Sequence, residues 1–90
     1  MESRTTERFR KSFENLPQKV QKDVKKVFKL WKADPYLKNL KFKKIHTKQN
    51  IYSVRIGLSY RALGLKKDST VIWFWVGSHG DYDNLIKEFK

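Results

Sequence analysis

Five side chains of this sequence have the chemistry needed to bind a phosphate group and to move protons beside it. His46 and His79 can take up or release a proton near neutral pH. Arg55 and Arg61 carry planar guanidinium groups that can hold two phosphate oxygens at once, which a lysine cannot do. Tyr82 lies three residues after His79, so both fall on one side of a helix. Together these residue types predict acid–base chemistry on a polyanion.

Each of these residues also has a structural interpretation, and the sequence leaves both open. His79 could act as a base, or it could cap and pack the start of a helix. Each arginine could bind phosphate or form a surface ion pair. Tyr82 could stack on a base or donate a hydrogen bond, or it could pack into the core. His46 could be a second proton-transfer group or an inactive loop residue. Four lysines around His46 would attract phosphate in either case: Lys41, Lys43, Lys44 and Lys48.

Several classes of site are excluded by the residue types present. The chain has no cysteine, which excludes disulfides, thiolate zinc sites and cysteine nucleophiles. The two histidines lie far apart without a nearby pair of carboxylates, so we expect no metal site. Asp81 and Asp83 fit the first turn of a helix better than a catalytic role. Without a glycine-rich phosphate loop or a nucleophile elbow, we expect chemistry that uses neither a metal nor a cofactor.

Two amphipathic helices are predicted to precede these residues. The first covers residues 7–16, where Phe9, Phe13 and Leu16 recur at the spacing of one helical face. Pro17 suits the first turn of a second helix, which ends at Asp34 because a residue before proline is pushed out of the helical region. The Ser and Thr residues before position 7 could cap the first helix or lie in a short strand.

A sheet must then cover the apolar side of this helical hairpin. Strands are predicted over residues 40–46, 51–56, 60–65 and 70–76, which are rich in β-branched and aromatic side chains. Alternation along the second strand places Arg55 on its polar face, and the last strand is apolar on both faces, as in a covered central strand. A short helix over residues 79–89 closes the chain. The sequence therefore predicts an α+β fold in one domain, residues 1–90, with an N-terminal helical hairpin packed on a four-stranded, mainly antiparallel sheet and a short C-terminal helix.

The net charge of the chain points to a polyanionic partner. Twenty-one Lys and Arg against nine Asp and Glu give a formal charge of +12, which costs folding free energy through self-repulsion. Nucleic acid, an anionic membrane surface or an acidic protein would offset that cost, and a merely lysine-rich solvated surface is the alternative. The N-terminus lacks the apolar core of a signal peptide, and the apolar run 71–76 is too short to span a bilayer. We expect a soluble, cytoplasmic protein.

The order of these signals resembles that of the RelE/ParE superfamily of toxin–antitoxin toxins. The resemblance covers nearly the whole chain and is carried by LPQKVQ at 16–21, DP at 34–35, YSVRIG at 52–57, YRAL at 60–63 and WFWVGSH at 73–79, with Tyr82 and Asp83 after them. One departure lies at the N-terminus. Members of the superfamily usually start with a clear strand, whereas here only residues 3–6 could serve, so that strand is expected to be short or absent.

The resemblance implies two possible activities. The RelE branch cuts mRNA without a metal, usually in the ribosomal A site, whereas the ParE branch poisons DNA gyrase and lacks the nuclease residues. Within the RelE-like pattern, Arg61 falls at a phosphate-clamping arginine and Arg55 at another basic active-site position. His79 falls where several such nucleases carry a catalytic His or Arg.

We therefore expect the toxin of a type II toxin–antitoxin system, a metal-free mRNA endoribonuclease acting on translating ribosomes. Cleavage needs a base for the 2′-OH, an acid for the departing 5′-oxygen and cations for the phosphorane. The candidates are His79, Arg61, Arg55, Tyr82 and His46. The implied partners are a cognate antitoxin protein, mRNA and the ribosome. A ParE-like gyrase inhibitor without nuclease activity, or a non-catalytic basic RNA-binding module, is the alternative.

Overall fold

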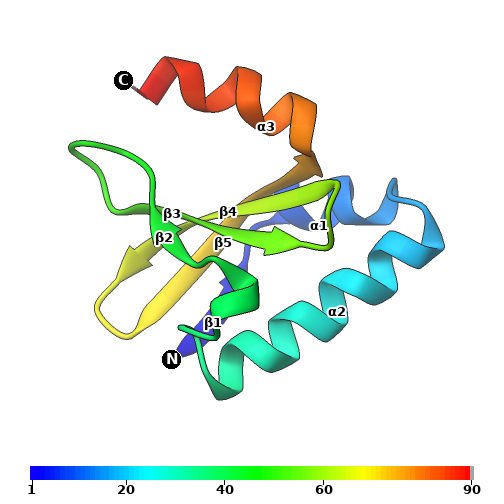
Figure 1. Ribbon diagram of the computed structural model, residues 1–90, viewed down its shortest axis with the longest axis horizontal. Coiled ribbons are helices and arrows are strands. Elements are labelled where there is room, and N and C mark those ends of the chain that lie inside the picture. Colours follow the sequence, from blue (N-terminus) through cyan, green and yellow to red (C-terminus); the bar gives the residue numbers. More distant parts are fainter. Residues whose placement is uncertain (90) are drawn as a thin grey trace.

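Five strands form one mixed sheet at the centre of the molecule (Figure 1). The computed structural model describes residues 1–89. The strands are β1 (Glu2–Thr5), β2 (Lys43–Lys44), β3 (Ile51–Ile56), β4 (Tyr60–Lys67) and β5 (Thr70–Ser78). They lie in the order β1-β5-β4-β3-β2, and all neighbours are antiparallel except β1 and β5, which are parallel.

The prediction of four strands was wrong, because β1 adds a fifth strand and precedes the helical hairpin. Residues 2–5 contain no apolar side chain, so nothing in their own pattern predicts a strand. Their pairing comes from tertiary context: the Glu2 amide donates to the Ser69 carbonyl (2.8 Å) and the Thr6 amide to the Trp73 carbonyl (3.0 Å). The strand predicted over residues 40–46 shrinks to β2, because Leu40 ends a 3₁₀ turn, η1 (Lys38–Leu40), and Lys41 has a left-handed backbone with φ 49°.

The helices lie close to where the apolar spacing predicted them, although the first ends at residue 14 rather than 16 and the last at residue 86 rather than 89. They are α1 (Glu7–Glu14), α2 (Gln18–Ala33) and α3 (His79–Ile86), which a 3₁₀ turn, η2 (Lys87–Phe89), extends. The Thr6 hydroxyl caps α1 by accepting a hydrogen bond from the Phe9 amide at 3.1 Å. None of the helices formed by residues 1–89 combines the length and the apolar character that a membrane crossing requires.

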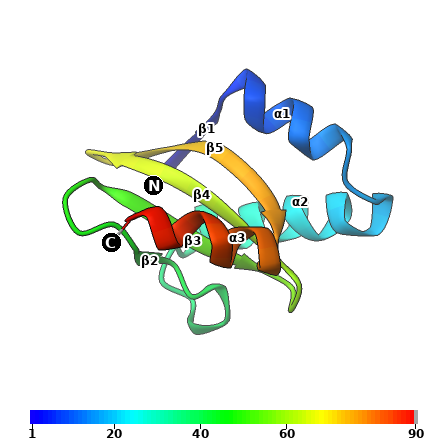
Figure 2. The ribbon, with the colours of Figure 1, turned by 90° about the horizontal axis from the view of Figure 1, so that it is seen from above.

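The helices cover the two faces of the sheet unequally (Figures 1 and 2). On one face α1 and α2 pack against the main core, in which Trp31 and Trp73 are fully buried with ring centroids 5.4 Å apart. On the other face α3 packs a smaller cluster centred on Ile51, Leu63 and Tyr82. The expectation that β5 is covered on both faces is therefore confirmed.

A bulge in β5 lets this strand serve both cores. The register passes from Leu63 opposite Trp75 to Gly64 opposite Trp73, so Phe74 is an extra residue on β5. As a result Trp73 and Val76 join the main core, while Phe74 and Trp75 pack in the cluster beneath α3.

The short helix α3 leaves part of its sheet face uncovered. Its apolar residues contact Ile51 and Leu63, but polar residues of β3 and β4 continue along the same face beyond them. Ser53, Arg55 and Arg61 lie in that continuation, next to the residue where α3 begins. The fold thus brings the predicted polar face of the sheet to the N-terminal end of α3.

Candidate functional site

A hollow of about 280 Å³ lies between the N-terminal half of α3 and the polar part of the sheet. We call it the α3 cleft. Residues from β2, β3, β4 and α3, and one residue from the segment before β2, line it: Lys41, Lys43, Ser53, Arg55, Arg61, His79, Tyr82, Asp83 and Ile86. Four of the five candidate catalytic residues lie here, together with two of the four lysines.

The two arginines of the cleft face each other across neighbouring strands. Arg55 on β3 is directly opposite Arg61 on β4, an arrangement of like charges that destabilises a sheet. Backbone carbonyls hold both side chains, since Arg55 Nε donates to the Gly57 carbonyl (3.0 Å) and Arg61 Nη1 to the Tyr60 carbonyl (2.7 Å). Each guanidinium keeps further N–H groups for another acceptor.

The charge of Arg61 is poorly compensated by the protein itself. Burial lowers the pKa of Arg61 from its ordinary value, and the neighbouring charge of Arg55 lowers it further, while Tyr82 and Asp83 act in the opposite direction. Two half-buried cations side by side would be stabilised by a bound anion. A phosphodiester has the charge and the geometry for two guanidinium groups.

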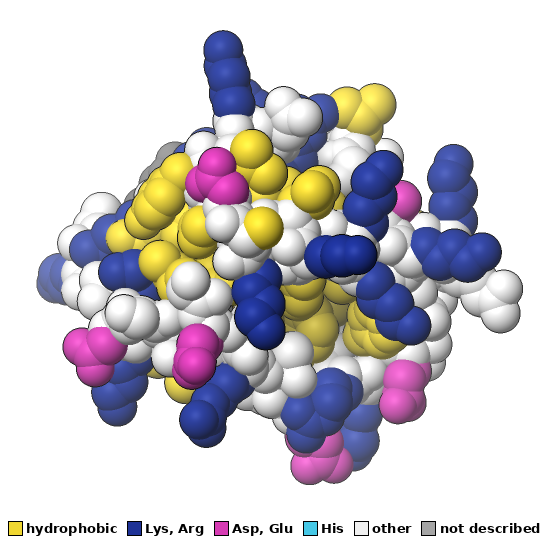
Figure 3. All heavy atoms as spheres, turned by 90° about the horizontal axis from the view of Figure 1, so that it is seen from below, with side chains coloured by type: hydrophobic (Ala, Val, Ile, Leu, Met, Phe, Trp, Pro, Cys, Tyr) yellow, Lys and Arg dark blue, Asp and Glu magenta, His cyan; other side chains and the backbone are white. Residues whose placement is uncertain are grey.

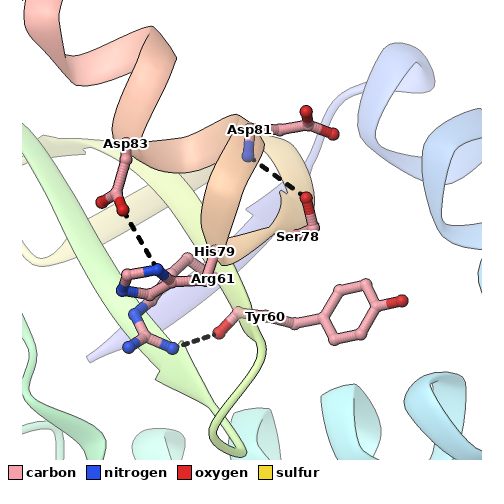
Figure 4. A network of polar contacts seen from close by, with 6 residues as sticks. All are labelled: Tyr60, Arg61, Ser78, His79, Asp81 and Asp83. Carbon is pink, nitrogen blue, oxygen red and sulfur yellow. Dashed lines mark hydrogen bonds and ion pairs between the residues drawn. The ribbon is translucent and has the colours of Figure 1, made fainter.

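His79 is held at the start of α3 by its backbone and by its ring, and Figure 4 shows the contact of the ring with Asp83. Its amide donates to the Ser59 carbonyl at 2.7 Å, which ties the helix to the turn between β3 and β4. On the ring, Nδ1 lies 3.1 Å from Asp83 Oδ2, one helical turn later. An ionised carboxylate only accepts hydrogen bonds, so Nδ1 carries the proton of this contact and the neutral ring keeps a free lone pair on Nε2.

Tyr82 is buried under the cleft rather than exposed in it. Only 7% of the residue is accessible, and its hydroxyl lies 3.2 Å from Ser53 Oγ. Its ring centroid is 6.1 Å from that of His79, as the spacing of three residues along the helix predicts. The ring of Tyr82 therefore packs into the core, which is one of the two readings that the sequence left open, and its hydroxyl reaches the lining of the cleft.

His46 lies apart from the other candidates. Its Nδ1 accepts hydrogen bonds from the Lys48 and Gln49 amides, both at 3.0 Å, and its ring packs 5.1 Å from that of Phe89. Phe89 ends η2, ten residues after His79, so the two histidines sit at opposite ends of the C-terminal helical segment. The structure therefore does not bring His46 into the cleft.

The four candidate lysines are also divided. Lys43 lies opposite Ser53 and shares its face, whereas Lys44 lies opposite Tyr52, whose ring belongs to the main core on the other side. Lys41 lines the cleft with Lys43, and Lys44 and Lys48 do not. Successive residues of a strand point to opposite faces, so Lys43 and Lys44 lie on different sides of the sheet although β2 has only two residues.

Two residues of the cleft were not anticipated in these roles. Asp83 was expected to be a first-turn helix acid, and it instead contacts the ring of His79. Its spacing of four residues from His79 was the available signal. Ser53, whose hydroxyl pairs with that of Tyr82, had no such signal, because strand register alone determines that contact.

Comparison with known proteins gives the fold independent support. No curated protein sequence matches this chain. Among solved structures, a chain of the RelB–RelE antitoxin–toxin complex from Methanococcus jannaschii matches with a TM-score of 0.69 at 23% identity, covering 91% of this chain and 96% of that one. A chain of the archaeal RelE–RelB complex from Pyrococcus horikoshii OT3 also gives 0.69, at 15% identity and with 88% and 94% covered. The isolated E. coli RelE toxin gives 0.65, at 19% identity and with 99% and 98% covered.

Structural matches at these low identities show a shared fold, whereas the family to which the chain belongs is shown by a family model. The model of the ParE-like toxin domain matches residues 18–84, which contain α2, the sheet from β2 to β5 and most of α3. The match agrees with the structural similarity to RelE toxins, so the chain belongs to the ParE-like toxin domain family within the RelE/ParE superfamily.

Proposed function

We propose that this protein is a metal-free mRNA endoribonuclease that acts on translating ribosomes as the toxin of a type II toxin–antitoxin system. The observation that carries the proposal is the convergence of His79, Arg61 and Tyr82 on one cleft. A proton acceptor, a phosphate clamp and a hydroxyl donor are the groups that 2′-OH-mediated cleavage requires.

His79 acts as the base in the proposed reaction. Its Nε2 takes the proton of the 2′-OH, and the resulting oxygen attacks the adjacent phosphorus. Asp83 fixes the tautomer that leaves Nε2 free and stabilises the imidazolium that forms. In this tautomer of the neutral ring, the lone pair that accepts the proton of the 2′-OH is on Nε2.

Arg61 and Arg55 bind the phosphate and stabilise the charge that builds on its oxygens. The bond from phosphorus to the 5′-oxygen then breaks, leaving a 2′,3′-cyclic phosphate on one fragment. Tyr82, whose hydroxyl donates a hydrogen bond to Ser53 Oγ in the free protein, gives this proton to the departing 5′-oxygen instead. The second fragment therefore ends in a 5′-hydroxyl.

An antitoxin protein is the proposed regulator. Two of the similar structures are antitoxin–toxin complexes, and a partner that covers the basic face of this protein would relieve its self-repulsion. Covering the α3 cleft would at the same time exclude RNA.

Primer extension on mRNA after induction of the protein tests the proposed activity. Wild type should give discrete cleavage sites, and His79→Ala should lower the cleavage rate by about 10²–10⁴-fold, the usual contribution of a general base. Arg61→Ala should also relieve growth arrest, whereas His46→Ala should remain active because its ring lies outside the cleft. Intact mRNA after induction, or equal loss of activity in the two histidine variants, would contradict the proposal.

Inhibition of DNA gyrase is the second candidate, and the ParE-like description of the matching family favours it. An inhibitor of this kind needs no base, so His79→Ala should leave growth arrest and DNA-damage signalling unchanged. Gyrase supercoiling assays with purified wild type and His79→Ala protein separate the two candidates.

A further inference from the structure

A larger hollow, of about 580 Å³, lies next to the α3 cleft. We call it the α2 hollow. It is bounded by α2 between residues 23 and 30, by residues 38–41 around η1, and by Gly57 and Leu58 in the turn between β3 and β4. Its volume is in the range of pockets that hold small organic ligands, which run from about 300 to 1,000 Å³.

The two hollows are neighbours, because they share two lining side chains. Lys41 and Arg55 line both of them, and the turn that borders the α2 hollow also accepts the hydrogen bond from the His79 amide through Ser59. Arg55, one of the two arginines that would hold the phosphate, therefore also borders the α2 hollow.

Cations surround an apolar floor in the α2 hollow. Lys26, Lys38, Lys41 and Arg55 are its basic lining residues. Figure 3, which views the molecule from the side of α2, shows apolar atoms at the bottom of a hollow with Lys and Arg side chains around it. Apolar contact below and positive charge around the rim match a nucleotide, whose base is flat and whose phosphate is negative.

Three residues of the lining are unusual for a plain surface. Leu58 is 79% exposed at the tip of a turn, where polar residues are usual, and Leu30, 42% exposed, lines the same hollow. Asp23 is the only acidic residue of α2, and within residues 1–89 it forms no ion pair of 4.0 Å or less, although four cations share the hollow. Its carboxylate is thus available to accept hydrogen bonds from a ligand.

We propose that the α2 hollow binds the base of a nucleotide next to the scissile phosphate and prefers a base that presents an amino group. Leu58 and Leu30 contact the face of the base, Asp23 accepts a hydrogen bond from its amino group, and the surrounding cations bind the flanking phosphates. Cytosine offers the N4 amino group to a carboxylate, whereas uracil offers the O4 carbonyl at the same position and would be repelled. This inference rests on the proposed function, because it assigns the hollow to the same RNA strand.

Binding of 2′-O-methyl oligonucleotides tests the proposal without cleavage, since these strands lack the attacking hydroxyl. Fluorescence anisotropy would compare oligocytidine with oligouridine of equal length. Wild type should bind oligocytidine about fivefold more tightly or better. Asp23→Asn should abolish this ratio, because an amide can pair with either base, and Leu58→Ala should weaken binding of both strands.

Matched controls separate base recognition from net charge and from folding. Asp68→Asn removes one exposed carboxylate at the distant turn between β4 and β5 and should preserve the ratio; Leu65→Ala removes an exposed leucine outside the α2 hollow and should leave both affinities unchanged. As a second measurement on the wild-type protein, cytidine monophosphate should shift the methyl resonances of Leu58 and Leu30 more than uridine monophosphate does.

The proposal would be overturned if wild type bound oligocytidine and oligouridine equally, or if Asp23→Asn kept the preference for oligocytidine. The hollow would then have another occupant, such as an acidic protein segment. Failure of the proposed function would look different. Base discrimination that depends on Asp23, combined with intact mRNA on translating ribosomes after induction, would support the subsite and contradict the nuclease.

Discussion

The contact between His79 and Asp83 can be tested by changing which ring nitrogen of His79 carries the proton. Asp83→Asn offers an amide N–H to Nδ1, which favours the tautomer with its proton on Nε2 and removes the base. We expect kcat for RNA cleavage to fall by about 10–100-fold or more, as for other partners that orient a histidine, while RNA affinity is retained. Single-turnover cleavage and binding measured on the same RNA separate the two quantities.

Asp81→Asn is the matched control for this change. It removes the same charge from the same helical turn, but Asp81 contacts the Ser78 hydroxyl through its backbone amide rather than the histidine ring through its carboxylate. If both variants lose activity equally, Asp83 acts through helix charge and not through His79.

The pair of arginines in the cleft should reduce the stability of the protein. The lowered pKa of Arg61 means that its charged form is disfavoured in the folded state, by burial first and by Arg55 second. Arg61→Met keeps much of the apolar stem and removes the charge. We expect the free energy of unfolding to rise by a few tenths to about 1 kcal/mol, because partial exposure screens the repulsion. Urea denaturation measures the change, and Arg4→Met, an exposed strand arginine, should show no such gain.

Residue types predicted most of the cleft, and three-dimensional context determined the rest. Alternation along β3 placed Arg55 on the polar face, and helical spacing placed Tyr82 beside His79, so local periodicity was sufficient for these positions. His46 carries the same chemistry as His79, but the local fold of its loop engages Nδ1 with two amides. A sequence lists proton-transfer groups, whereas only the fold shows which of them meet.

At the scale of the elements, Gly64 allows β4 to pass under two large side chains. A Cβ atom built at this position would lie 2.7 Å from Trp73 Cε3 and would also clash with Val71 Cγ1. Both neighbours belong to the main core and are fully buried, so neither can move away cheaply. Gly64→Ala should therefore destabilise the protein by about 1–3 kcal/mol, as overpacking usually does, which thermal unfolding would detect.

Gly80→Ala is the control for this substitution, because a Cβ atom at Gly80 meets nothing within 4 Å and alanine favours a helix. If the two variants are equally stable, the backbone of β4 adjusts more easily than its neighbours suggest.

Elements with a clear apolar period were predicted well, and elements formed by pairing alone were not. The pattern of residues 51–56 predicted β3 with its observed bounds, and Pro17 marked the start of α2, although it caps this helix rather than lying in its first turn. In contrast, β1 has no apolar pattern, and β2 is limited by the left-handed residue Lys41. Both are edge strands, whose existence depends on a neighbour that distant sequence supplies.

Only some of the basic residues that give the whole molecule its charge of +12 line the α3 cleft. Basic residues gather on the α2 side (Figure 3) and also line the cleft, and together they produce a positive potential that attracts any polyanion from a distance. Local contacts must then distinguish a bound RNA strand from general attraction. Lys43 and Lys44 of β2 can distinguish general attraction from local contact with RNA. They are adjacent in the sequence and carry equal charges, but they lie on opposite faces of the sheet.

The salt dependence of RNA affinity should respond to Lys43 and not to Lys44. Each phosphate contact on single-stranded RNA contributes about 0.7 to the slope of log affinity against log salt, through release of a counterion. Lys43 lines the α3 cleft, so Lys43→Gln should lower this slope by about that amount. Lys44→Gln removes an equal charge from the opposite face and should leave the slope nearly unchanged. Anisotropy titrations of 2′-O-methyl RNA over a range of salt concentrations measure both slopes. Equal reductions in the two variants would mean that RNA follows the overall charge of the molecule and does not settle in the cleft.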